Sequence, residues 1–141
     1  MILLITAAAL ASPGRATGTL TVATTPKTTP VLVRAAGELG LMRHLAGTAE
    51  VGQLPGPHRF AVGVGPVLEV ESRWVRVGLV AMPELTGQGA LQARGGVRAS
   101  WLAFWGLSLT ARCDTVWHGG SRGRGGALGA PELGGGLSLR L

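Results

Sequence analysis

Charged residues, cysteine and long apolar runs are all scarce in this chain of 141 residues. Only 14% of the residues are charged, whereas an ordinary soluble domain has about 25%. The single cysteine, Cys113, excludes an internal disulfide framework and a cysteine-based structural metal site. After the first dozen residues no apolar run reaches the roughly 18 residues that a membrane-spanning helix needs. The sequence therefore excludes a helical membrane protein, yet its low charge suggests that part of the surface meets something other than water.

The N-terminal segment reads MILLITAAALA over residues 1–11 and ends in Ala9-Leu10-Ala11. Signal peptidase prefers to cleave after a small residue, any residue and a second small residue. We therefore predict a signal peptide over residues 1–11 and a single domain over residues 12–141. Because the segment has no positively charged start, a plain first strand or a misassigned start remains the alternative.

Apolar residues recur with a period of two along most of the chain, which indicates β-strands with one apolar face. Over residues 60–71 the even positions are apolar and the odd positions are small or charged. Over residues 75–81 the odd positions are apolar instead. A two-residue hairpin reverses parity in this way, so we predict a tight turn at Ser72-Arg73 that sets Glu71 beside Trp74.

In two further stretches the apolar residues stay at odd positions throughout. Each stretch is too long for one strand. From Leu91 to Cys113 every odd position is apolar or small, so we predict two strands joined by an odd-numbered turn near Ser100. The same argument joins residues 31–39 to residues 45–51 through a turn at Leu41-Met42-Arg43.

Residues 17–24 and the C-terminal alternation of Leu137, Leu139 and Leu141 bring the number of candidate strands to eight. The three short turns fall at one end of the resulting sheet. The other connections are longer or rich in Pro and Gly, and we predict them at Thr25–Thr29, Leu54–His58, Glu84–Gly89 and Val116–Leu133. The echo of Pro83-Glu84-Leu85 in Pro131-Glu132-Leu133 predicts two similar transitions from strand to loop. The pattern is that of an all-β, up-and-down antiparallel transmembrane β-barrel of about eight strands.

With this alternation and these connections, the chain resembles the small eight-stranded bacterial outer-membrane β-barrel proteins over nearly all of residues 12–141. In that family the last strand ends in an aromatic residue, and here Leu141 takes its place. The resemblance implies a bacterial outer-membrane location, a monomer in contact with outer-membrane lipid, and a structural, adhesion or lipopolysaccharide-interacting role without catalysis. For the aromatic belts of such a barrel we expect Trp74 and Trp101 beside short turns, Trp117 beside the last loop, and Trp105 in the lipid band.

If the apolar face meets lipid, the polar face lines a lumen that eight strands make just wide enough to fill with side chains. Unpaired buried charges are costly, so we predict a plug of structural ion pairs in preference to a conducting pore or a binding cavity. The predicted members are Arg34, Glu38, His44, Glu50, Glu69, Glu71, Arg76, Arg94, Arg98, Arg112, Asp114 and Arg140.

The Gly-rich segment over residues 117–126 contains Arg122 and Arg124. Arginine binds phosphate through paired hydrogen bonds, which suggests contact with lipopolysaccharide phosphates. The alternatives are a plain solvated loop and an RNA-binding Gly/Arg segment. Two arginines without interleaved aromatic residues form a weak nucleic-acid signal, so we expect no nucleic-acid partner.

Two structural alternatives remain open. Residues 29–47 also carry apolar residues at helical spacing, and a helix there would remove two strands. A secreted or periplasmic soluble all-β binding domain would show the same alternation, with the apolar face as its core. The polar face holds Gly, Ala, Arg and Glu, which suits a crowded lumen better than a solvated surface. No nucleophile elbow, P-loop or dinucleotide motif is present, and the three histidines have no metal-site spacing, so we expect no enzyme, cofactor or metal.

Overall fold

A computed structural model of the protein describes residues 15–25, 28–42, 44–53, 59–72, 74–119 and 126–140. The predicted signal peptide over residues 1–11 and the loop residues Arg122 and Arg124 lie outside this part. Its strands are β1 (Ala16–Thr25), β2 (Thr28–Met42), β3 (Leu45–Gln53), β4 (Phe60–Glu71), β5 (Val75–Thr86), β6 (Leu91–Phe104), β7 (Leu107–His118), β8 (Ala127–Leu128) and β9 (Glu132–Arg140). Among these described residues there is no helix with the length and apolar character needed to cross a bilayer.

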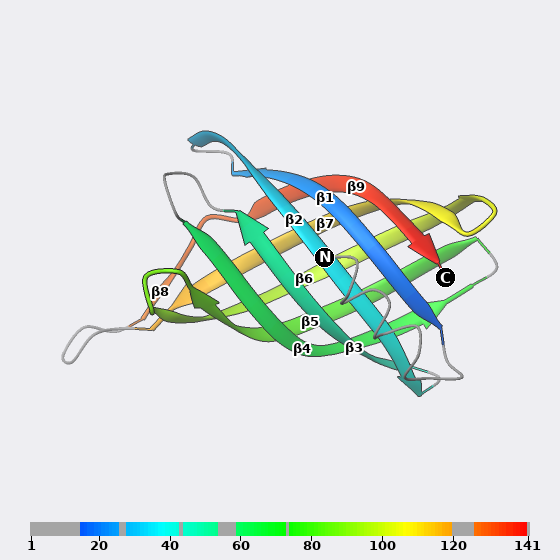
Figure 1. Ribbon diagram of the computed structural model, residues 1–141, viewed down its shortest axis with the longest axis horizontal. Coiled ribbons are helices and arrows are strands. Elements are labelled where there is room, and N and C mark those ends of the chain that lie inside the picture. The colour runs from blue at the N-terminus through cyan, green and yellow to red at the C-terminus, as the bar shows by residue number, and fades with distance from the viewer. Residues whose placement is uncertain are drawn as a thin grey trace.

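The eight long strands form one closed antiparallel barrel (Figure 1). From β1 to β7 each strand pairs with the next one along the chain, and β9 pairs with both β1 and β7. The two-residue β8 extends the sheet beside the end of β7, where Trp117 lies opposite Leu128. The predicted up-and-down barrel of about eight strands is confirmed.

The helical alternative for residues 29–47 is wrong, because this segment forms β2 and the start of β3. β2 has a partner on each side, as Val33 shows by lying opposite Val22 of β1 and Gln53 of β3. Two-sided pairing satisfies the backbone hydrogen-bonding groups. In a helix, Gly37 and Gly40 would each cost about 1 kcal/mol relative to alanine.

Side chains alternate between the two faces of the sheet, with apolar residues outside and polar residues inside. From Phe60 to Val70 the even positions of β4 are exposed, and the odd positions are buried or half-buried. In β5 the parity is reversed, so that Val77 and Leu79 are exposed between buried even positions. The buried apolar cluster is small and centres on Val67, Val80 and Met82 with Ala46. Polar and charged side chains fill most of the remaining interior.

The β4–β5 turn lies one residue later than predicted. The Ser72 N–H donates to the Val75 carbonyl oxygen at 2.8 Å, so the turn falls between these two residues. Glu71 therefore lies opposite Arg76 and not beside Trp74. The predicted reversal of parity between β4 and β5 still holds, because a two-residue turn in either register produces it.

The β6–β7 turn lies well beyond its predicted position near Ser100. β6 continues to Phe104, and Trp105 and Gly106 form the turn with φ angles of 41° and 84°. The register shifts by one residue between Leu102 and Phe104. A bulge plus a two-residue turn preserves parity just as an odd-numbered turn would. β2 does the same at its end, where the register shifts between Gly40 and Met42, so the strand extends into the predicted 41–43 turn.

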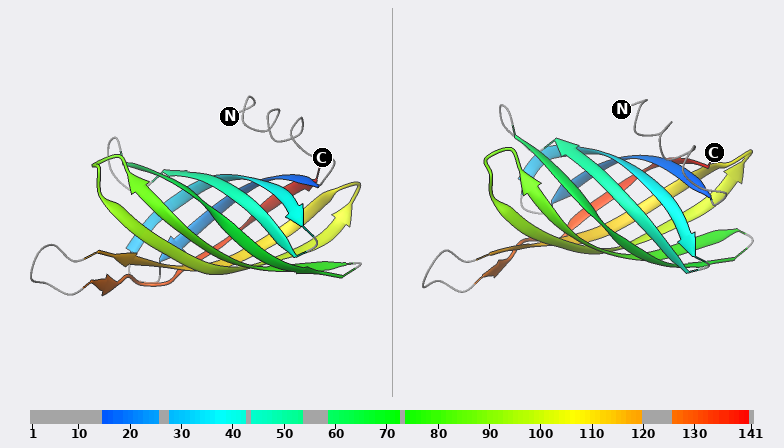
Figure 2. Two further views of the ribbon diagram at one scale, coloured as in Figure 1. Left: turned by 90° about the horizontal axis from the view of Figure 1, so that it is seen from below. Right: turned by 60° about the horizontal axis from the view of Figure 1, so that its bottom comes forward.

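The three hairpin turns share one end of the barrel with the start of β1 and the end of β9, and we call this the turn end. The connections β1–β2, β3–β4, β5–β6 and β7–β9 lie at the opposite end, the connection end (Figures 1 and 2). Strands extend further towards the connection end than predicted: β5 runs to Thr86 and β9 begins at Glu132. The predicted loops Glu84–Gly89 and Val116–Leu133 are correspondingly shorter, as is Thr25–Thr29, because β2 begins at Thr28.

Candidate functional site

Every acidic residue of the chain lies inside the barrel or at its turn-end mouth. The sequence has seven Asp and Glu residues, and each forms an ion pair with arginine. The acids are Glu38, Glu50, Glu69, Glu71, Glu84, Asp114 and Glu132, and their partners are Arg15, Arg34, Arg76, Arg94, Arg98, Arg112 and Arg140. Equal numbers of opposite charges make this network neutral, so mutual attraction offsets the loss of hydration.

At the connection end two arginines and two glutamates form a compact buried group. The Arg34 guanidinium lies 2.9 Å from Glu84 Oε1 and 3.1 Å from Glu132 Oε2. Arg94 binds the same two carboxylates, at 3.1 Å from Glu84 Oε2 and 2.6 Å from Glu132 Oε2. Gln92 Nε2 donates to Glu84 Oε2 at 2.5 Å. Each carboxylate therefore lies between two guanidiniums, an arrangement that is neutral without any counter-ion.

The middle of the lumen holds a second group around Arg98 and Arg112. Arg112 Nη2 lies 3.1 Å from Glu50 Oε2, and the same guanidinium pairs with Asp114. Arg98 also pairs with Glu50. Asp114 Oδ2 is 3.4 Å from Arg94 Nη1, which joins this group to the connection-end group.

The turn end holds the third group, which is less buried than the other two. Arg15, directly before β1, pairs with Glu69 and Glu71, and Arg140 Nη1 lies 3.1 Å from Glu71 Oε1. Burial lowers the pKa of the Arg15 guanidinium, and the Glu69 carboxylate acts in the opposite direction. The Arg140 side chain is half exposed, so its ion pair stabilises the barrel less than a buried one does.

Arg76 and Glu38 connect the turn end to the middle group. Glu38 Oε1 accepts from Arg98 Nη1 at 2.6 Å, while its Oε2 lies 3.7 Å from Arg76 Nη1. The other described contacts of Arg76 are equally long, at 3.6 Å to Glu69 Oε2 and 3.4 Å to Thr17 Oγ1. Arg76 is thus the most loosely held of the inward arginines described.

His44 is the one predicted member that the structure does not place in the network. It is exposed in the turn before β3, where its Nδ1 lies 3.1 Å from the Glu69 backbone oxygen. The alternation of the neighbouring strand predicts that the His44 side chain faces the lumen. A side chain in a turn does not follow this alternation.

The alternation in the sequence does not predict three members of the network, Arg15, Glu84 and Glu132. The two glutamates lie in segments that read as loops because each follows a proline, yet each is in a strand and contacts Arg34 and Arg94. The repeated Pro-Glu-Leu is the signal that could have identified them, since it brings two equivalent carboxylates to the same end of the barrel. Arg15 precedes the first predicted strand, so the alternation predicts nothing about the direction of its side chain.

Inward-facing glycines leave the space that the large charged side chains need. A Cβ at Gly52 would lie 2.6 Å from Arg34 Nη1, and one at Gly96 would overlap the Asp114 carboxylate. A Cβ at Gly134 would come within 3.1 Å of Arg112 Cγ. The glycine content of the strands is therefore part of the same arrangement as the ion pairs.

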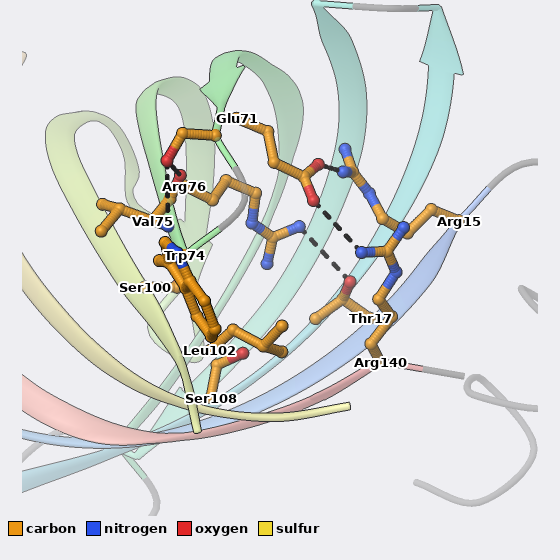
Figure 3. Close-up of a pocket in the computed structure, with 11 residues that line it drawn as sticks. Arg15, Thr17, Glu71, Trp74, Val75, Arg76, Ser100, Leu102, Ser108 and Arg140 are labelled. Atoms are coloured by element: carbon orange, nitrogen blue, oxygen red, sulfur yellow. Dashed lines mark hydrogen bonds and ion pairs between the residues drawn. The ribbon is translucent and has the colours of Figure 1, made fainter. Parts of the chain in front are cut away.

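Side chains of the described network line two cavities. The larger has a volume of about 120 Å³ and lies at the turn end, where Arg15, Arg76, Arg140 and Trp74 contribute to its wall (Figure 3). The smaller, about 10 Å³, lies between Glu38, Glu69 and Arg98. In the described ranges no group of three or more His, Cys, Asp and Glu side chains is arranged to hold a metal ion.

The exposed aromatic residues gather at the two ends of the barrel. Phe60 and Trp117 lie at the connection end, and Trp74, Trp101, Phe104 and Trp105 lie at the turn end. The expectation that Trp105 lies in the lipid band is wrong, because it forms the β6–β7 turn and is fully exposed. Trp74 lies in the β4–β5 turn itself, one residue further from β4 than the predicted turn, and its indole lines the turn-end cavity (Figure 3). Aromatic residues at both ends of an apolar band are typical of barrels that span a bilayer.

Solved structures share this fold, and three of them illustrate it. A structure described as "De novo design of transmembrane beta-barrels" matches with a TM-score of 0.75 at 15% identity, over 92% of this chain and 98% of the other. The solution NMR structure of the de novo designed TMB2.3 matches with a TM-score of 0.67 at 16% identity, over 94% and 98%. Neisserial surface protein A (NspA) matches with a TM-score of 0.52 at 10% identity, over 89% and 94%. The chain therefore has the fold of transmembrane β-barrels. No protein-family model matches the sequence, and no curated protein matches it either.

Proposed function

We propose that this protein is an integral β-barrel of a bacterial outer membrane with a structural, adhesion or lipopolysaccharide-interacting role and no catalytic activity. One observation carries the proposal: the charged side chains of the described strands lie in the lumen or at its mouth, and the outward side chains are uncharged. Soluble proteins have the opposite arrangement. A charge on the lipid face of a barrel costs about 2–4 kcal/mol at the bilayer midplane, which explains its avoidance here.

Outward apolar side chains also argue against the alternative, a soluble secreted or periplasmic binding domain. Val64 is 63% exposed, Leu79 57% and Leu137 49%. Val64 and Leu79 lie on the paired strands β4 and β5, and Leu137 lies on β9, which pairs with β1 and β7. In water, an apolar surface of this extent would drive association or aggregation. In a bilayer the same surface needs no partner besides lipid.

The proposed contact with lipopolysaccharide rests on the positive charge that the lumen network leaves over. The connecting segments at the connection end contain Lys27, Arg59, Arg122 and Arg124. They contain no acidic residue, because all seven acids belong to the network. In outer-membrane barrels the longer loops face the outside, where lipopolysaccharide phosphates would meet these cations.

Gel mobility after refolding in detergent tests the barrel assignment. We expect β-rich circular dichroism and a band whose mobility changes only after heating, because closed barrels resist the gel detergent. A protein that stays soluble and monomeric without detergent and runs unchanged on heating would instead be the soluble domain.

Binding to immobilised lipopolysaccharide tests the second part of the proposal. The variant R122Q/R124Q should be retained less than the unmodified protein, and removal of the lipid phosphates should abolish the difference. R43Q/R73Q removes the same charge from segments at the turn end and serves as the matched control. Equal retention of the two variants would contradict a phosphate contact at the connection end.

A further inference from the structure

The turn-end cavity combines a positively charged wall with an apolar one. Arg15 and Arg140 line one side of it with the Glu71 carboxylate, Trp74, Ser100, Leu102 and Ser108 line the other side, and the Arg76 guanidinium lies between them (Figure 3). At about 120 Å³ it has room for a group of several non-hydrogen atoms, whereas the smaller cavity holds about one water molecule.

Charge is unevenly distributed within the neutral network. At the turn end the three guanidiniums of Arg15, Arg76 and Arg140 lie around two carboxylates, those of Glu69 and Glu71, and Glu71 itself lines the cavity. A third carboxylate, Glu38, is shared: its Oε2 lies 3.7 Å from Arg76 Nη1, and its Oε1 accepts from Arg98 at 2.6 Å. The excess positive charge at this end therefore lies around the cavity, where an anion would neutralise it.

Among the described residues, Arg76 has no acceptor closer than 3.4 Å. A guanidinium carries five N–H donors, yet the described contacts of Arg76 all lie at 3.4–3.7 Å, beyond the usual range of N–H···O bonds. Buried arginines elsewhere in the lumen reach 2.6–2.9 Å. The Arg76 side chain is only 16% exposed, so bulk water replaces the missing acceptors poorly.

We propose that this cavity binds a phosphate monoester, with the Arg76 guanidinium donating paired hydrogen bonds to the phosphate oxygens. The planar fork of arginine matches phosphate in this way. Arg15 and Arg140 add positive charge, and the hydroxyls of Ser100 and Ser108 are further donors at the wall. The indole of Trp74 and the side chain of Leu102 provide an apolar surface for the organic part of the ester. This site lies at the opposite end from the proposed lipopolysaccharide contact and does not depend on it.

Calorimetric titration of the full chain, refolded in zwitterionic detergent, tests the site. The three probes are inorganic phosphate, glycerol 1-phosphate and a short-chain lysophosphatidic acid, with sodium chloride at matched ionic strength as the salt control. Saturable binding of the two soluble phosphates places the source of the ligand in solution. Saturable binding of the lysolipid alone identifies a lipid headgroup. No saturable binding of any probe overturns the proposal.

Variants show whether Arg76 carries the binding. R76Q should weaken the affinity about tenfold or more, because it removes a charge-assisted hydrogen bond. R43Q, which removes the same charge from the connection between β2 and β3, should leave it unchanged. R76K keeps the charge but loses the planar fork, so it should also weaken binding. Heat-dependent gel mobility identifies which variants are folded. If R76Q does not fold, R76K decides, and an affinity equal to that of the unmodified protein overturns the proposal.

Discussion

The two faces of one sheet differ more in this protein than its two ends do. Asp114 and Cys113 are neighbours in β7, yet Asp114 is 1% exposed among arginines while Cys113 is exposed on the outer face. Cys113 lies opposite Val97 of β6 and Leu133 of β9, so its surroundings are apolar. Each face is therefore suited to a different medium. The lumen supplies its own counter-charges, and the outside presents nothing that needs water.

Removal of a buried carboxylate should lower the free energy of unfolding more than any change to the outer face or to a glycine. We expect E84A to lower the free energy of unfolding by about 3–5 kcal/mol, because Arg34 and Arg94 lose a shared counter-charge in the buried interior. E71A removes the same charge from the partly exposed mouth and should cost about 1 kcal/mol or less. Urea unfolding of the refolded proteins in lipid vesicles measures both values. Equal losses would mean that the lumen is as well hydrated as its mouth.

Placing a charge on the outer face should have the next largest effect. V64R puts an arginine in the middle of β4, where Val64 is 63% exposed, and should cost about 2–4 kcal/mol in a bilayer. L128R puts the same charge at the connection end, where the cost should be about 1 kcal/mol or less. The same unfolding measurement applies. Equal tolerance of the two substitutions would contradict a lipid-facing band.

A smaller effect should distinguish an inward glycine that makes room for charge, Gly96, from an outward glycine, Gly37. G96A adds a methyl group that overlaps the Asp114 carboxylate, and overpacking of this kind costs about 1–3 kcal/mol. A Cβ at Gly37 would have no atom within 4 Å, so G37A should be neutral or stabilise the strand by about 0.5–1 kcal/mol. Thermal unfolding in detergent compares the pair. A loss in G37A as large as that in G96A would show that strand flexibility, and not space, explains these glycines.

The sequence predicts the two faces well because alternation is a local property. Parity alone assigns Val62 and Val77 to the outside, and it assigns Glu69 and Arg94 to the inside. The position at which a strand ends is not a local property of the sequence, because a strand continues as long as its neighbours offer hydrogen-bond partners. Ala93, for example, lies opposite Pro83, so β5 continues past a residue that reads as a loop signal. That extension is what brings Glu84 into the lumen.

Contacts between distant segments could not be predicted from alternation. The sequence identifies most members of the lumen network as inward-facing, but the pairing of Arg34 with Glu84 and Glu132 depends on closure of the barrel. The turn-end cavity likewise gives no sequence signal, because side chains from several strands that are distant in sequence line it together. A bulge and a turn at positive φ together moved Trp105 to the barrel end, and neither follows from the apolar pattern.

Whether the outer face of the barrel meets lipid is tested most directly at Cys113, the only cysteine of the chain. A nitroxide spin label attached to this side chain, in protein refolded into phospholipid vesicles, reports collisions with oxygen, which concentrates in lipid, and with a water-soluble nickel complex. We expect frequent collisions with oxygen and few with nickel, because Cys113 lies in the middle of an outward apolar surface. Frequent collisions with nickel would show that the outer face meets water, and the assignment of the barrel to a membrane would be wrong.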